Sequence, residues 1–263
     1  MAPHSGHRRL LVEVVAGLLL VSSVCAVFWW IFQHLDRGLE WKRAWNYRES
    51  LWKGWLLTLG ASAAALPGSC LVAAILVAGS RAKLHSVRWF TRGFVEIVRG
   101  MPLLTLVLIG YYLIFAQREI AELLDSMGLG SKMFAGIALL SVFTAAYLSE
   151  ILRGGLDSIP QGQIDSARAV GFDRVQVLRY VIVPQALRRV LPALAGQFVT
   201  LVKDSSLLSV IGVQEFTYSA RAYNSATYGG IEAFLLLAVG YLLITLPIAW
   251  FAHWMESRFR YQM

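Results

Sequence analysis

Long apolar runs separated by short polar intervals constrain this chain more than any other feature. Six segments combine the length and the apolar content of a membrane span: 10–32, 56–79, 94–116, 133–152, 190–212 and 231–253. A helix needs about 20 mainly apolar residues to cross the hydrocarbon core of a bilayer. Only 15% of the 263 residues are charged, against about a quarter in a soluble domain. The pattern predicts an all-α integral membrane protein with about six transmembrane helices.

Lysine and arginine residues indicate how these spans are oriented. With the N-terminus in the cytoplasm, the segments on that side are the N-terminus, 80–93, 153–189 and 254–263, and together they hold 14 of the 24 Lys and Arg residues. Cytoplasmic loops carry such an excess, so both termini are expected in the cytoplasm. The net charge of +8 would also suit nucleic-acid binding, but the basic residues flank apolar spans and form no single patch. No nucleic-acid partner is therefore expected.

The first span opens an N-terminal region, residues 1–53. Its apolar run from Leu10 to Phe32 is longer than a signal-peptide core and lacks an A-x-A cleavage site, so we expect it to be retained as a transmembrane helix. Residues 34–53 are polar and aromatic, which is typical of an amphipathic segment that lies on the external surface of the membrane. Residues 54–263 form the second region, and its longest polar interval is the loop 153–189.

The loop 153–189 reads as two short helices joined at a glycine. Residues 164–170 have helical character, and Gly171 suits a left-handed C-cap. Asp173 caps a second helix, from Arg174 to Val183, which Pro184 is expected to stop. An apolar face on such a hairpin suits the groove of a partner protein. Periodicity alone leaves open the alternative that this face packs on the chain's own transmembrane ends.

The loop resembles the EAA loop of importer-type ABC permeases. Asp165-Ser166-Ala167, then Gly171, then Val181-Ile182-Val183-Pro184 keep the spacing of that motif, with Asp in place of Glu, Ser in place of the first Ala, and Val in place of Ile and of Leu. Other segments resemble the polar amino-acid uptake permeases in particular, and these are Arg99–Leu104 (with Met101 at a Thr position), Tyr147–Gly155, Leu201–Leu207 and Ser209–Glu215. The resemblance covers roughly residues 54–260.

The resemblance implies a permease subunit that works with other proteins in the bacterial cytoplasmic (inner) membrane. It implies a five-helix core, preceded here by an extra N-terminal helix, and a cytoplasmic coupling loop on which a separate ATPase subunit docks. The residues that would receive the ATPase are Ile164, Asp165, Ser166, Ala167, Gly171 and Pro184. It also implies a second permease subunit, identical or related, and a periplasmic or extracellular solute-binding protein that delivers an amino acid.

The chain itself is not expected to be an enzyme. It contains no Gly-x-x-x-x-Gly-Lys-Ser/Thr loop for nucleotide phosphates, so ATP and Mg are expected on the partner ATPase, with no cofactor, catalytic residue or metal site here. Its five histidines are scattered and lack the spacing of metal ligands. A stand-alone secondary transporter or channel is the alternative; such a protein needs a full pathway in one chain, often with internal repeats, and no repeat is visible.

Polar side chains inside the spans mark a candidate substrate pathway. Ionisable groups at membrane depth are costly and commonly functional, and a zwitterion needs a cation for its carboxylate and an acceptor for its ammonium group. The candidate residues are Arg99, Met101, Gln197, Lys203, Asp204 and Ser205. Lys203 and Asp204 could instead pair with each other and hold a helix break open. Glu150 and Arg153, three residues apart, are expected to form a structural ion pair at the inner mouth.

Relatives that handle basic amino acids often carry Glu at the position of Gln197, so Gln at this position disfavours a cationic substrate. The sequence does not name the amino acid, and it leaves open whether the second permease is another copy of this chain.

Overall fold

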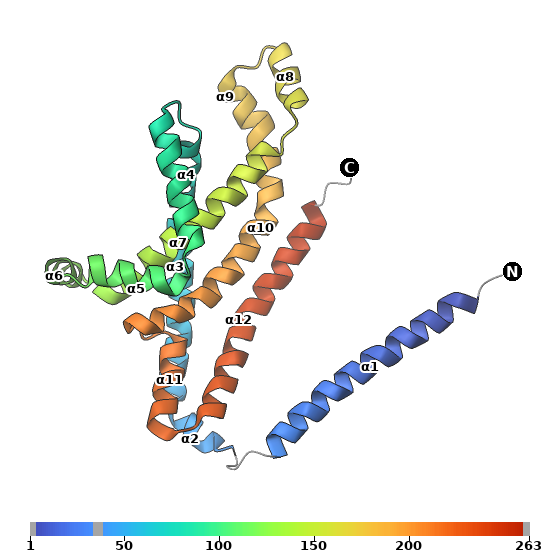
Figure 1. The fold of residues 1–263 in the computed structure, drawn as a ribbon, viewed down its shortest axis with the longest axis vertical. Coiled ribbons are helices and arrows are strands. Elements are labelled where there is room, and N and C mark those ends of the chain that lie inside the picture. The colour runs from blue at the N-terminus through green and yellow to red at the C-terminus, as the bar shows by residue number, and fades with distance from the viewer. Residues whose placement is uncertain (1–3, 34–38, 260–263) are drawn as a thin grey trace. The chain divides into compact units, whose positions relative to one another are not determined.

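The structure is a computed structural model that describes residues 4–33 and 39–259. Over these residues it is entirely helical, with no strand, so the prediction of an all-α protein is confirmed (Figure 1). In chain order the helices are α1 (His4–Gln33), α2 (Trp41–Asn46), α3 (Arg48–Ser80), α4 (His85–Gly100), α5 (Leu103–Gly110), the π-helix η1 (Tyr111–Phe115), α6 (Arg118–Ser126), α7 (Ser131–Asp157), α8 (Gln161–Ala169), α9 (Arg174–Gln176), the π-helix η2 (Val177–Ile182), α10 (Val183–Asp204), the 3-10 helix η3 (Ser205–Ile211), α11 (Phe216–Thr227) and α12 (Gly230–Phe259).

The chain divides into two compact units, Met1–Glu40 and Trp41–Met263. The first unit contains α1, whose apolar stretch within the described side chains is Val14–Val27. The expected external segment 34–53 lies partly outside the described residues, which resume at residue 39. The assignment of 1–53 as a separate membrane-anchored region therefore stays a prediction.

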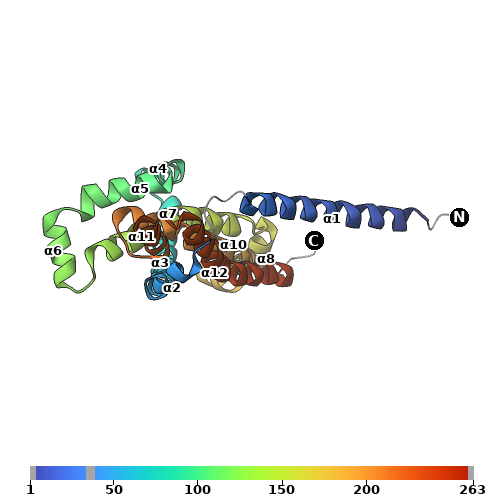
Figure 2. The same cartoon turned by 90° about the horizontal axis from the view of Figure 1, so that it is seen from below.

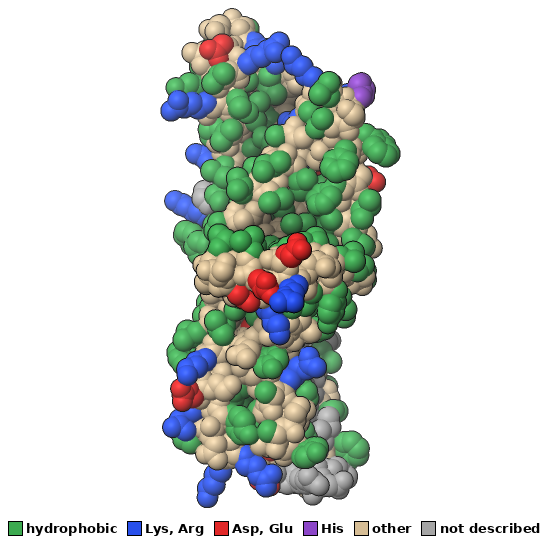
Figure 3. Space-filling view, turned by 90° about the vertical axis from the view of Figure 1, so that its left-hand side faces the viewer, with side chains coloured by type: hydrophobic (Ala, Val, Ile, Leu, Met, Phe, Trp, Pro, Cys, Tyr) green, Lys and Arg blue, Asp and Glu red, His purple; other side chains and the backbone are tan. Residues whose placement is uncertain are grey.

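Four long helices of the second unit can cross a membrane. They are Arg48–Ser80, Ser131–Asp157, Arg174–Ile211 and Gly230–Met255. A bent pair of helices can supply a fifth span, and the sixth predicted span, in α1, stays a prediction. Hydrophobic side chains are spread over much of the face seen in Figure 3, and charged side chains gather at its two ends and in one group across its middle.

Close packing of α3 on α7 forms the centre of the second unit (Figures 1 and 2). Ala65 and Ala73 of α3 are fully buried, and the Ser141 hydroxyl of α7 donates to the Ala65 carbonyl across 3.1 Å. Small residues let two backbones approach, which is how membrane helices gain packing energy when lipid is as apolar as the side chains.

The predicted span 94–116 is wrong as one continuous helix. The segment folds as two helical pieces, first α4 and then α5 together with η1, and the helix direction bends by 111° between them. Pro102 explains the break, because it has no backbone N–H to continue a helix and it pushes the residue before it toward extended backbone. Met101 accordingly has ψ of 142°. The first piece also begins at His85, earlier than predicted.

The predicted stop at Pro184 is also wrong. A continuous helical stretch runs from Arg174 to Ile211 and passes through Pro184, so the fifth span starts well before residue 190. Pro184 is the second residue of α10, and only Val183 separates it from the π-helix η2. The wider turn of a π-helix changes the hydrogen-bond register at this point, so a residue without an N–H is tolerated as at the start of a helix.

A buried carboxylate ties three helices together on the side of the unit opposite the 153–189 loop. Glu215 is fully buried and accepts hydrogen bonds from the backbone N–H groups of Thr217 and Tyr218, both at 2.8 Å. The Thr58 hydroxyl of α3 (3.3 Å) and the Tyr241 hydroxyl of α12 (3.2 Å) also donate to it. These donors offset the cost of burying the carboxylate and cap the start of α11.

We expect Gly54→Ala to destabilise the second unit. A Cβ at Gly54 would lie 2.9 Å from the Glu215 carbonyl oxygen, which is backbone and cannot turn away, and overpacking of this kind costs roughly 1–3 kcal/mol. Gly60→Ala on the same helix is the control, because nothing lies within 4 Å of the added Cβ and alanine favours a helix by roughly 0.5–1 kcal/mol. Thermal unfolding in detergent checks both; equal midpoints for the two variants would contradict the packing described.

Candidate functional site

The loop 153–189 folds as a hairpin whose turn is made by Gly171. This residue has φ of +92°, a left-handed conformation that favours glycine, so the predicted C-cap is confirmed. Asp173 and Gln176 form a capping box, in which the side-chain oxygen of each residue accepts a hydrogen bond from the backbone N–H of the other, both at 2.8 Å. The helix cap predicted at Asp173 is therefore also confirmed, and the turn is well defined on both sides.

One part of the hairpin packs inward and the rest is open. Ala167 is buried and Ile164 is half-buried. Val170 and Val175, on either side of the turn, are 75% and 70% exposed. Each of the two alternatives for the apolar face thus applies to different residues. The hairpin packs on its own chain through Ala167, and it leaves an apolar tip uncovered that a partner protein could bind.

Asp165 and Ser166 lie on the open side of α8. The Asp165 carboxylate accepts a hydrogen bond from the Gln161 amide at 3.1 Å and lies 3.8 Å from the Arg168 guanidinium. Its side chain is 60% exposed. The carboxylate is thus held in place within α8 while it stays accessible to another protein. Pro184 is exposed as well, one residue into α10.

Polar contacts join the hairpin to the transmembrane helices. The Gln185 amide of α10 donates to the Gln163 side chain of α8 at 2.6 Å, and the Arg189 guanidinium donates to the Ser158 carbonyl at the end of α7 at 2.5 Å. Gly155 of α7 lies directly against α10, where an added Cβ would meet Val190. Displacement of the hairpin would therefore be passed to both α7 and α10.

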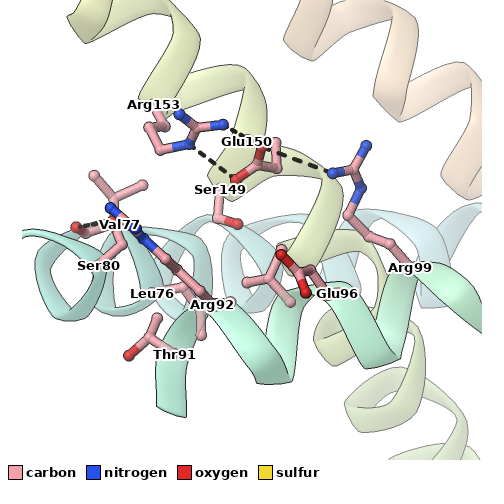
Figure 4. A pocket seen from close by; sticks show the side chains of 11 residues that line it. Leu76, Val77, Ser80, Thr91, Arg92, Glu96, Arg99, Ser149, Glu150 and Arg153 are labelled. Atoms are coloured by element: carbon pink, nitrogen blue, oxygen red, sulfur yellow. Dashed lines mark hydrogen bonds and ion pairs between the residues drawn. The ribbon is translucent and has the colours of Figure 1, made fainter. Parts of the chain in front are cut away.

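A chain of ion pairs runs along the same end of α7. Glu150 binds Arg153 at 2.6 Å, which confirms the predicted pair, and it also lies 3.7 Å from Arg99 of α4. Arg153 reaches Asp157 at 3.4 Å, and Asp157 binds Arg81 at the end of α3. These residues join α3, α4 and α7 beside a pocket (Figure 4).

The candidate pathway residues separate into two groups. Gln197, Lys203, Asp204 and Ser205 lie along α10 and at its junction with η3. Arg99 instead contacts α7, through Glu150 and the ring of Tyr147. No hydrogen bond or ion pair links it to the α10 group within the described residues.

Lys203 and Asp204 stand at the end of an α-helix. Lys203 is exposed and Asp204 is half-buried, and within residues 4–33 and 39–259 no ion pair or hydrogen bond involves either side chain. The charge of Lys203 nevertheless acts on the Asp204 carboxyl, so the alternative that the two pair with each other stays a prediction. Ser205 is fully buried and donates to the Val202 carbonyl at 2.8 Å, whereas Met101 packs against the main apolar core.

Sequence reasoning missed Arg92 and Glu96 of α4, which line the pocket beside Glu150. Their spacing from each other and from Arg99, four and then three residues, places all three on one face of a helix. This spacing is visible in the sequence, but the predicted span began at residue 94 and so separated Arg92 from the other two residues. Glu215 was noted only as part of a motif, because its partners on α3 and α12 are far away in the sequence.

Comparison with known proteins places this architecture in a family. Residues 71–261 match the family described as "Binding-protein-dependent transport system inner membrane component". The chain is 31% identical over 206 residues to the probable glutamine ABC transporter permease protein GlnM of Bacillus subtilis (strain 168), across 78% of this chain and 91% of that protein. It is 34% identical over 211 residues to the probable glutamine permease GlnP of the same organism, across 79% and 93%. The chain therefore belongs to the family of ABC-importer permeases.

Solved structures agree with the family assignment. An amino acid ABC transporter determined with histidines has 27% identity and a TM-score of 0.73, with 84% of this chain and 100% of that chain covered. The MetNI methionine ABC transporter, at 18% identity and a TM-score of 0.61 over 83% and 98%, shares the fold. The protein is thus a multi-pass membrane permease subunit, and ATP hydrolysis belongs to a separate subunit. These matches do not favour a stand-alone transporter or channel.

We expect Asp173→Ala to loosen the helix that follows Gly171. Loss of an N-cap costs roughly 1 kcal/mol, and no residue of the first turn, Arg174–Gln176, is buried. Hydrogen exchange of the amides from Arg174 to Ile182 should accelerate several-fold. Asp173→Asn, which keeps an oxygen acceptor, should exchange like the unchanged protein; faster exchange in that variant would show that the cap is not the cause.

Proposed function

We propose that this chain is a permease subunit that imports a polar amino acid, with glutamine as the first candidate. The single observation that carries the proposal is the Gly171 hairpin, which presents an exposed apolar tip and is fastened to two membrane-spanning helices. The relatives named for glutamine transport align over more than three quarters of the chain, which supports the substrate class.

The proposed assembly contains an ATPase subunit, a second permease subunit and a solute-binding protein outside the membrane. Val170 and Val175 enter a groove of the ATPase, and Asp165 contacts the groove from α8. ATP and Mg bind to the ATPase and not to this chain. The hairpin is then cytoplasmic, and both termini lie on the same side, which the distribution of lysine and arginine supports.

The proposed pathway follows α10 and its junction with η3. The Lys203 ammonium group attracts the carboxylate of the substrate, and the Asp204 carboxylate attracts its ammonium group. In the described part of the chain neither side chain forms a hydrogen bond or an ion pair, although the two charges act on each other. Gln197, closer to the hairpin on the same helix, offers a neutral amide to the substrate side chain. A second permease subunit encloses the other side of the cavity, since five or six spans are few for a complete pathway.

Gly171→Ala tests the coupling hairpin. Nothing lies within 4 Å of an added Cβ, so the effect is conformational: a left-handed residue other than glycine costs roughly 1–2 kcal/mol. We expect less ATPase to copurify with the tagged permease and uptake into proteoliposomes to fall. Gly154→Ala, also in open space but within helix α7, is the control. If both variants retain the ATPase and transport equally, the hairpin is not the docking element.

Asp204→Asn tests the pathway. The change keeps the shape of the side chain and removes the charge, so uptake driven by a glutamine-loaded binding protein should fall roughly tenfold or more. Assembly with the ATPase should be unchanged, because no ion pair among residues 4–33 and 39–259 involves Asp204. Glu119→Gln on α6, an exposed acid, is the matched control. Normal uptake in Asp204→Asn would remove this residue from the pathway.

The experiment that tests the proposed function as a whole is uptake by the reconstituted complex. Liposomes that hold both permease subunits and the ATPase would be supplied with ATP inside and with a binding protein loaded with glutamine, or with another amino acid, outside. ATP-dependent accumulation of one polar amino acid is expected. If no amino acid accumulates while the ATPase is bound and active, the substrate class is wrong.

A further inference from the structure

A pocket of about 310 Å³ lies between α3, α4 and α7, at the end of the unit that carries the hairpin (Figure 4). Its volume is at the lower end of the range for small-molecule sites, roughly 300–1,000 Å³. Ser80 of α3, Thr91 of α4 and Ser149 of α7 contribute hydroxyl groups to the wall, and Leu76 and Val95 contribute apolar surface. Three helices thus converge on a small space with both polar and apolar sides.

Charges of both signs line this pocket. Glu150 is shared between Arg153, at 2.6 Å, and Arg99, at 3.7 Å, and the charge of Arg92 also acts on it from a greater distance. Arg92 and Glu96 project from one face of α4 toward the same space (Figure 4), and in the described part of the chain neither forms an ion pair or a hydrogen bond. The pocket therefore offers one cation and one anion that have no direct partner, separated by one helical turn.

We propose that this pocket binds a zwitterionic α-amino acid. A carboxylate fits the Arg92 guanidinium, which can donate two parallel hydrogen bonds to it, and the ammonium group fits the Glu96 carboxylate. A single anion, such as a phosphate or the headgroup of an acidic lipid, would satisfy Arg92 but would place its charge near Glu96 and Glu150. The pairing of these opposite charges is what favours a zwitterion over an anion.

The site is distinct from the pathway proposed along α10, because none of Gln197, Lys203, Asp204 and Ser205 lines it. It lies at the hairpin end, so it faces the compartment into which the importer releases its substrate. An amino acid bound there would bridge α4 to the ion pairs of α7. The choice of ligand and the cytoplasmic placement rest on the proposed function.

Protection of an introduced thiol locates the ligand directly. Ser80→Cys would be made in a Cys25→Ser, Cys70→Ser background, and the complete complex would be held in lipid nanodiscs without the binding protein. L-Glutamine should slow maleimide labelling at position 80, but not at Lys83→Cys, which is exposed and outside the pocket. N-Acetylglutamine, which lacks the ammonium group, should protect poorly.

Two charge-removing variants then assign the contacts. Arg92→Gln and Glu96→Gln should each raise the glutamine concentration that halves the labelling rate by about tenfold or more, since each loses a charge-assisted contact. Arg88→Gln is the matched control, because Arg88 contacts His85 one turn earlier and does not line the pocket. Unfolding temperatures would confirm that all three variants are folded.

Three outcomes would overturn the proposal: no protection at position 80, equal protection by inorganic phosphate, or unchanged half-protection in both charge variants. Uptake measured on the same complexes separates this failure from failure of the proposed function. Glutamine transport without protection at position 80 overturns the pocket alone, whereas a complex that transports no amino acid overturns the proposed substrate class.

Discussion

The backbone of a membrane protein must satisfy its own hydrogen bonds, because hydrocarbon offers none. Helical structure over residues 4–33 and 39–259 follows from this requirement, and so does the position of each irregularity. Non-helical or altered backbone is tolerated at membrane depth where protein covers it or where it lines a water-filled cavity. The break at Met101-Pro102 is followed by the buried Leu103, and the change from α10 to η3 begins at the fully buried Ser205.

The same constraint explains where the charged groups of the spans lie. Asp204 and Lys203 stand where an α-helix ends, and Arg99 precedes the bend at Pro102 by three residues. A charge in the middle of a regular helix could be paired only by side chains from neighbouring helices. At a helix end, unpaired backbone groups and water are also available. The candidate substrate contacts therefore lie where the helices break, because a charged group is tolerated best at a helix end.

Sequence alone predicted the elements that depend on local composition. The spans that became α3, α7 and α12 are continuous apolar runs, and Gly171 and Asp173 carry their turn and cap preferences within a few residues. The sequence did not predict elements that depend on the hydrogen-bond register of a helix or on tertiary contacts. Pro184 was expected to end a helix, but the π-helix before it changes the hydrogen-bond register.

The ion pairs at the end of α7 suggest how the hairpin and the pocket beside α4 are mechanically related. Glu150, Arg153 and Asp157 occupy one side of α7 at spacings of three and four residues, and their partners lie on the ends of α3 and α4. The hairpin is bound to the same end of α7 through Arg189 and the Ser158 carbonyl. A movement of α7 relative to α4 would change the distance between Glu150 and Arg99 and with it the wall of the pocket. The hairpin is also continuous with α10, so movement received there would act on the pocket wall through α7 and on the α10 junction through α10.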